Sequence, residues 1–145
     1  MSKNFEWKDL GLEKIKDTIK TLKKTTIKTG LLRKSGRKLA MVAFWNEFGT
    51  VHIPETPFLR SSLENKNFNN LKVIMSNELN KLYKSHDTKA FCKNIAEFHK
   101  ATIKLQISSR IFDKNKTSTV KKKGFDHRLI QTGEMFNRID YEIKQ

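Results

Sequence analysis

The sequence contains a single cysteine, Cys92, among its 145 residues. One thiol excludes an intramolecular disulfide framework and any zinc site built from several cysteines. The chain also lacks an apolar run of the ~18 residues that a membrane span requires. Its first residues, MSKNFEWKDLGLEK, mix charges of both signs where a secretory signal would be apolar. We therefore expect a soluble protein made in a cytoplasm.

Acidic residues are scarce relative to basic ones. The 15 Asp and Glu face 30 Lys and Arg, which gives a net charge of +15. A field of this sign attracts polyanions or acidic protein surfaces. Hydrophobic residues make up 37% of the chain, enough to bury a core, and the length is typical of one domain. We expect residues 1–145 to form a single domain.

Sequence patterns for catalysis and cofactor binding are missing as well. No two of the four histidines have the i, i+4 spacing with a neighbouring Glu that presents two imidazoles to zinc. Cys92 precedes His99 by seven residues, about two helical turns, so we expect a buried, inert thiol. The six glycines are scattered and form no phosphate-binding loop. We expect no catalytic residues, no metal and no cofactor.

The first part of the chain has the spacing of a helix followed by strands. Apolar residues at helical intervals predict an amphipathic helix over residues 8–24. A short β-branched stretch, a basic turn at Gly36 and a short apolar run then predict a β-hairpin over residues 25–44. Its two strands would be Thr25–Leu32 and Lys38–Phe44.

The rest of the chain is predicted to be mostly helical. Residues 57–109 have the pattern of a helical hairpin, with Pro57 in the first turn and Asp87 as the N-cap of the second helix. Residues 110–128 read as a long basic loop. Residues 129–145 predict a helical turn followed by a strand, because apolar and acidic residues alternate near the end.

Two segments hold much of the positive charge. Residues 25–44 contain five basic and no acidic side chains, and residues 110–128 contain seven basic and two acidic ones. We expect these basic loops to face DNA or an acidic neighbouring protein, with a merely solvated surface as the alternative. The candidate residues are Lys28, Arg33, Lys34, Arg37, Lys38, Lys114, Lys116, Lys121, Lys122, Lys123 and Arg128.

Two further blocks combine glycine turns with aromatic and apolar residues. The first, Ala43–Arg60, reads AFWNEFGTVHIPETPFLR, and the second, Thr119–Ile143, reads TVKKKGFDHRLIQTGEMFNRIDYEI. Taken singly, Gly49 and Gly133 would supply backbone conformations that other residues disfavour. Likewise Phe48, Phe58 and Leu129 would fill the core.

The order of these residues resembles the tailed-bacteriophage virion morphogenesis family, whose members include tail completion, neck, minor tail and head-tail connector proteins. Three residues depart from the family pattern: Thr56 replaces Arg, Arg128 replaces Pro and Gln131 replaces Asp. The matching residues of the first block are Asn46, Glu47, Phe48, Gly49, Thr50, Ile53, Pro54, Pro57, Phe58, Leu59 and Arg60. Those of the second block are Thr119, Val120, Lys123, Gly124, Leu129, Ile130, Thr132, Gly133 and Met135.

The resemblance implies an α+β fold, with a small mostly antiparallel sheet packed against long α-helices. It implies a non-enzymatic virion structural protein of the neck or head-tail junction that assembles as a ring around the DNA exit path. We expect a homo-oligomer, a hexameric ring, in contact with other phage neck, connector and tail proteins. Non-specific contact with packaged DNA is a further expectation, and no contact with a membrane is expected.

Four residues of the first block are candidates for supporting a ring interface, although a role in the monomer core is an equal alternative. They are Phe48, Ile53, Phe58 and Arg60. The alternative function is that of a small basic, sequence-independent nucleic-acid-binding protein. A phage-encoded hydrolase would need a clustered acid and base set that the sequence does not display.

Overall fold

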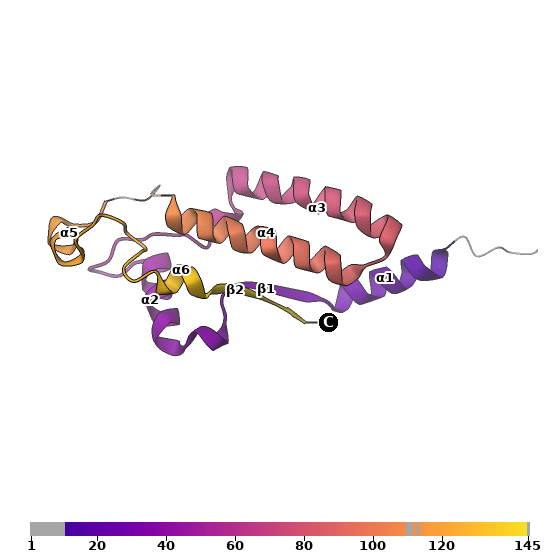
Figure 1. The fold of residues 1–145 in the computed structure, drawn as a ribbon, viewed down its shortest axis with the longest axis horizontal. Coiled ribbons are helices and arrows are strands. Elements are labelled where there is room, and N and C mark those ends of the chain that lie inside the picture. The colour runs from indigo at the N-terminus through magenta and orange to yellow at the C-terminus, as the bar shows by residue number, and fades with distance from the viewer. Residues whose placement is uncertain (1–10, 110–111, 113, 145) are drawn as a thin grey trace, which may run out of the picture.

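A computed structural model describes residues 11–109, 112 and 114–144. The elements in chain order are α1 (Leu12–Lys24), β1 (Thr26–Leu31), the 3-10 turn η1 (Arg33–Ser35), α2 (Arg37–Phe48), the 3-10 turn η2 (Ser61–Leu63), α3 (Asn65–Ser85), α4 (Thr88–Ser108), α5 (Thr117–Lys123), α6 (Glu134–Arg138) and β2 (Ile139–Lys144). Two antiparallel strands lie against long helices, so the expected α+β class is confirmed (Figure 1).

The sheet joins the two ends of the described chain. β1 pairs with β2 in an antiparallel register that runs from Thr26 opposite Lys144 to Leu31 opposite Ile139. The predicted C-terminal turn and strand are therefore present, as α6 and β2. Because β2 follows α6 directly, this pairing brings the last segment of the chain next to α2 and β1.

The long helices form two layers over this sheet. α4 contacts both strands on one side and α3 on the other, so it lies in the middle of the molecule (Figure 1). This position explains why α4 buries side chains along its whole length, from Cys92 and Ala96 to Ile103 and Ile107. The core cluster consists of Ala43, Phe58, Ile103, Ile107, Leu129, Met135 and Ile139.

The predicted helical hairpin is present, but it begins later than expected. Asp87 caps α4, since its carboxylate accepts a hydrogen bond of 2.9 Å from the backbone N–H of Ala90. Pro57 does not start a helix, because residues 57–60 form a turn that leads into η2, and α3 begins only at Asn65. The N-terminal helix is observed from Leu12, and residues 8–10 of that prediction lie outside the described residues.

The predicted β-hairpin over residues 25–44 is wrong. Only its first strand exists, and Lys38–Phe44, predicted as the second strand, belongs to helix α2. A short apolar run has no periodicity that separates a buried strand from a helix, and leucine, methionine and alanine favour the helix here. The strand that β1 requires comes instead from the far end of the chain.

The basic segment 110–128 was predicted as a loop, and this is wrong in part. Thr117–Lys123 forms helix α5, which ends at Gly124 with φ of 80°. The backbone N–H of Gly124 donates to the Val120 carbonyl and so closes the last helical turn. Residues 110, 111 and 113 of this prediction lie outside the described residues.

Candidate functional site

A buried carboxylate fixes the end of α2 to the segment that follows it. The Glu47 side chain is buried, with 2% of its residue surface exposed. It accepts hydrogen bonds of 2.9 Å from the backbone N–H groups of Leu59 and Arg60 and one of 3.2 Å from Arg60 Nε. Arg60 Nη2 also donates to the Glu47 carbonyl and to the Glu55 carboxylate. Hydrogen bonding to Glu55, and then to Glu47, raises the pKa of Arg60.

The turn after α2 closes on Gly49 and Thr50. Gly49 has φ of 72°, which confirms the positive φ expected from the sequence. Thr50 Oγ1 accepts hydrogen bonds from the backbone N–H groups of His52 and Ile53, and the Thr50 N–H donates to the Ile53 carbonyl at 2.7 Å. A bond from the Thr56 N–H to the Asn46 carbonyl then ties the returning segment to the helix. The first block is thus one folded unit.

The second block builds the start of α6 and part of the core. Gly133 has φ of 77° and directly precedes the helix, while Thr132 Oγ1 accepts from the Glu134 N–H. Leu129 and Met135 are buried, and Ile130 is half-buried. The second block therefore packs into the same core as Phe58 of the first.

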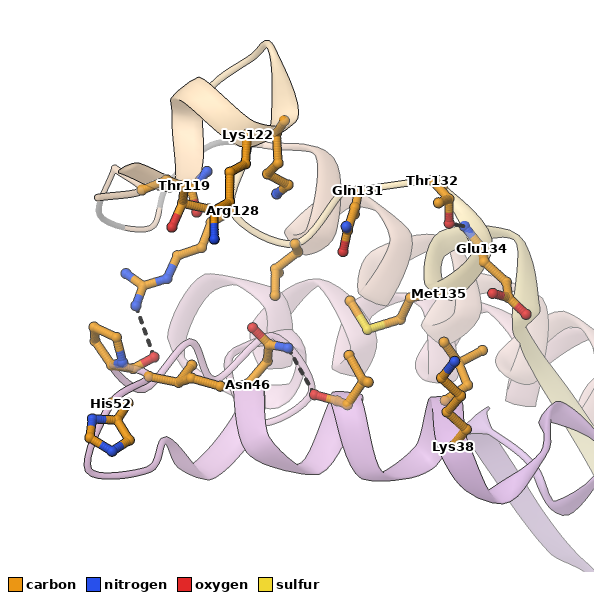
Figure 2. A pocket seen from close by; sticks show the side chains of 18 of the residues that line it. Lys38, Asn46, His52, Thr119, Lys122, Arg128, Gln131, Thr132, Glu134 and Met135 are labelled. Atoms are coloured by element: carbon orange, nitrogen blue, oxygen red, sulfur yellow. Dashed lines mark hydrogen bonds between the residues drawn. The ribbon is translucent and has the colours of Figure 1, made fainter. Parts of the chain in front are cut away.

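Arg128 links the two blocks at the surface. Its Nη2 atom donates a hydrogen bond of 2.8 Å to the Pro54 carbonyl (Figure 2). This residue stands where the resembled family has proline, so the departure supplies a contact that proline could not make. The other two departures differ in exposure: Thr56 is completely buried, whereas Gln131 is exposed.

A cleft of about 800 Å³ lies between α2 and the segment that contains α5 and α6. Figure 2 shows Lys122 and Arg128 on one side of this cleft and Lys38 and Asn46 from α2 on the other. Its basic lining residues are Arg37, Lys38, Lys114, Lys116, Lys122, Lys123 and Arg128. Glu134 is the acidic residue among the described lining residues, so the lining carries seven positive charges and one negative charge.

Both predicted basic segments contribute to this cleft, which the sequence did not indicate. Seven of the eleven candidate residues line it, and four lie elsewhere. Lys34 forms an ion pair of 2.5 Å with Asp140, and Lys28 lies opposite Glu142 in the sheet. Arg33 is exposed in η1, and Lys121 is exposed on α5 outside the cleft lining.

The pair between Lys34 and Asp140 has a structural role. Asp140 also accepts a hydrogen bond of 3.1 Å from Lys100 on α4, so two ammonium groups from different elements meet at one carboxylate of β2. Hydrogen bonding to Lys34 and then to Lys100 holds the pKa of Asp140 well below its usual range. Lys34 therefore fastens η1 to the sheet.

The basic residues of the cleft differ in how far their charge is compensated. Lys123 is half-buried and its Nζ donates to the His127 carbonyl at 2.8 Å, and burial lowers the pKa of this lysine. Lys38, Lys116 and Lys122 are exposed, and their ammonium groups form no ion pair or hydrogen bond with the residues that the structure describes. These three ammonium groups are open to an anionic ligand.

Helix α2 also exposes apolar side chains, most of them from the run that the sequence predicts to be a strand. Met41, Phe44, Trp45 and Phe48 retain 39–56% of their surface in the described chain. The rings of Phe44 and Phe48 lie 4.8 Å apart between centroids, and the Arg60 guanidinium lies 5.2 Å from the Phe48 ring centroid. We call these four residues the α2 patch. Its only sequence signal is an apolar run without an amphipathic period.

The four candidates for a ring interface differ in their exposure in the structure. Phe58 has no exposed surface and belongs to the core, so its side chain is not available to a partner. Ile53 is half-buried and lines the cleft. Phe48 and Arg60 are exposed beside each other, at one end of the α2 patch.

One side-chain pair has the spacing of a nucleophile and its base. Ser62 Oγ lies 3.1 Å from His99 Nε2. Ser62 is only 2% exposed, and its hydroxyl donates to the Leu59 carbonyl at 2.6 Å, while burial lowers the pKa of His99. A substrate cannot reach this hydroxyl, so we assign the pair to packing between η2 and α4. Cys92 is buried as expected, and burial raises the pKa of its thiol.

In the described part of the chain, no group of three or more His, Cys, Asp or Glu side chains is placed to hold a metal ion. None of the helices in the described ranges has the length and apolar character to cross a membrane. Comparisons with protein-family models, with curated proteins and with solved structures find no match.

Proposed function

We propose that this chain is a non-enzymatic structural protein of a bacteriophage virion, placed at the neck or head-tail junction, where it acts as a tail completion or connector protein. It would assemble as a homo-oligomeric ring around the DNA exit path. The observation that carries this proposal is the α2 patch. The order of the two sequence blocks supports it, because that order resembles proteins of this class.

The α2 patch has the properties of an assembly surface. Contiguous apolar side chains on an exposed surface mark sites of protein association. The Glu47 and Arg60 contacts hold the end of α2 in place, so little ordering entropy would be lost on association.

A ring also needs a second, different surface, because its subunits meet head to tail. The side of α3 that faces away from α4 offers one, since Val73 is 60% exposed and Tyr83 is 71% exposed. α3 and α2 lie on opposite sides of α4 and the sheet (Figure 1). We therefore propose that the α2 patch of one subunit contacts α3 of the next.

Native mass spectrometry and negative-stain microscopy of the purified chain test this arrangement. We expect a closed ring for the unmodified protein and a monomer for Trp45→Glu and for Val73→Glu. A mixture of these two variants should give a dimer, because one Trp45→Glu subunit and one Val73→Glu subunit retain a single intact interface between them. The matched control is Leu105→Glu, at a side chain 59% exposed on α4, which should still form the ring.

Circular dichroism of each variant checks that the helices are retained. A ring that persists in Trp45→Glu would contradict the role of the α2 patch. A monomer at every concentration of the unmodified protein would contradict self-assembly.

A second candidate function is sequence-independent nucleic-acid binding, which the excess of positive charge in the cleft favours. Phosphate contacts release counterions, so the logarithm of the binding constant should fall linearly with the logarithm of the salt concentration. Titration with duplex DNA at increasing salt measures this slope. Salt of about 0.5 M should abolish phosphate-driven binding but leave an apolar ring intact.

A further inference from the structure

We propose that the cleft between α2 and the α5–α6 segment binds an extended acidic segment of a different protein, in which acidic side chains alternate with apolar ones. This inference deepens the proposed role as an assembly component and rests on it. It names the chemistry of one neighbour, which the sequence blocks do not specify.

The first argument is charge. Lys38 from α2 and Lys116 and Lys122 from the other wall are exposed at the cleft without a counterion among the described residues. Seven basic side chains against Glu134 make the lining strongly cationic. Like charges held on facing walls repel each other until an anion enters, so an acidic ligand gains both attraction and relief of this repulsion.

The second argument is the apolar part of the lining. Leu39, Val42, Ile53, Leu129 and Met135 also line the cleft. Leu129 and Met135 are only 7% and 6% exposed, so apolar groups lie deeper than the three exposed lysines. In an extended chain, successive side chains point to opposite sides. A segment that alternates acidic and apolar residues would direct one set toward the lysines and the other toward the apolar lining.

Nucleic acid fits this lining less well. Proteins that hold single strands stack the bases on aromatic side chains, and the described lining residues include no Phe, Tyr or Trp. A volume of about 800 Å³ is in the range of pockets that enclose a small ligand or a short segment, not a duplex. A duplex would contact the outermost lysines and leave the apolar side chains uncovered.

A second copy of this chain does not supply the occupant. Of its 15 acidic residues, only Asp140 and Glu142 have the spacing of two residues that such an alternation requires. The segment that alternates apolar and acidic residues, residues 139–143, is strand β2, which is already paired with β1. The occupant must therefore come from a different protein.

Binding of labelled synthetic peptides to the full chain tests the proposal. The first probe is a short peptide of alternating Glu and Leu, and the second has Ser in place of each Leu, so that both carry the same charge. Oligothymidylate and a short DNA duplex are the nucleic-acid probes. We expect the Glu-Leu peptide to bind more tightly than the other three.

Two double variants of equal charge locate the binding. Lys38→Glu with Lys122→Glu reverses two cations of the cleft, and Lys93→Glu with Lys121→Glu reverses two exposed lysines outside its lining. Lys123 is left unchanged because its hydrogen bond to His127 supports the fold. The cleft variant should bind the Glu-Leu peptide at least about tenfold more weakly. The control variant should retain most of its affinity for the Glu-Leu peptide, because neither Lys93 nor Lys121 lines the cleft. Lys121 is a close control, since it is the neighbour of Lys122 on α5.

Three outcomes would overturn the proposal. Equal binding of the Glu-Leu and Glu-Ser peptides would show that the apolar lining plays no part. Equal losses in the two double variants would show that only net charge matters. If either nucleic acid bound more tightly than the Glu-Leu peptide, and only the cleft variant lost this affinity, the cleft would be a nucleic-acid site. Native mass spectrometry of the same samples reports ring formation separately, so a failure of the proposed ring and a failure of peptide binding are distinct results.

Discussion

Gly49 occupies a position that disfavours any side chain. Its φ of 72° is uncommon for residues with a side chain, and a Cβ there would lie 3.0 Å from both the Ile53 carbonyl oxygen and the Glu55 backbone nitrogen. Both neighbours are backbone atoms, so neither can rotate away. The turn that returns the chain from α2 to the Glu47 carboxylate depends on this glycine.

We expect Gly49→Ala to lower the free energy of unfolding by about 1–3 kcal/mol through backbone strain alone, and by more because of the two contacts. Gly36→Ala is the matched control. Gly36 also has a positive φ, 88°, but a Cβ there would meet no atom within 4 Å. Urea unfolding of both variants measures the difference. Equal losses would show that strain, not the close approach to residues 53 and 55, accounts for the requirement.

Some of these residue roles were predictable from the sequence, and others were not. The glycine turns and the core positions of Phe58 and Leu129 were expected and are present. Phe48 was also expected in the core, but it is 56% exposed. Its burial depends on which direction α2 faces, and that is decided by packing rather than by the residues next to it.

Among the elements, α2 shows why a local sequence pattern was insufficient to predict the secondary structure. A short apolar run after a basic turn predicts the second strand of a hairpin, but this run forms helix α2. The partner of β1 is β2, more than a hundred residues later, and such non-local pairing leaves no mark in a short window. By contrast, α4 and the Asp87 cap depend on local spacing and are present as predicted, whereas α3 is present but begins at Asn65 and not at Pro57.

The attachment of α2 can be tested at Glu47. We expect Glu47→Gln to lower the free energy of unfolding by about 2–3 kcal/mol, because the buried amide loses the charge and places its NH2 group opposite at least one of the N–H donors that the carboxylate accepts from. Glu55→Gln, which alters the exposed partner of the same arginine, should cost less than about 1 kcal/mol. Chemical denaturation of the two variants gives both values. Similar small losses would mean that Glu47 is not the group that holds the segment.

For the molecule as a whole, the cleft depends on the arrangement of distant segments. Lys38 lies near the start of α2, whereas Lys122 and Arg128 come more than eighty residues later. Pairing of β2 with β1 carries the α5–α6 segment back to α2 (Figure 1). The sequence identified both basic segments, but their convergence follows from the topology and could not be read from either segment alone.

The net charge of +15 predicts an unusual dependence of stability on salt. Repulsion within a strongly cationic chain destabilises the compact state, and the exposed ion pairs, such as Lys16 with Glu13, each offset little of it. Raising salt from about 0.01 M to about 0.15 M shortens the screening length from ~30 Å to ~8 Å. We therefore expect the Tm to rise by a few degrees in differential scanning calorimetry.

The same two double variants distinguish the effect of clustered charge on stability from the effect of dispersed charge. Each lowers the net charge to +11, since two lysines change sign, yet only Lys38→Glu with Lys122→Glu acts where cations face each other across a cleft. Its Tm should therefore rise less with salt than the Tm of Lys93→Glu with Lys121→Glu, because less local repulsion remains to be screened. Identical salt responses would show that the cleft cations are too far apart to repel. A Tm that falls with salt in the unmodified chain would show that ion pairs such as Lys34 with Asp140 outweigh the net repulsion.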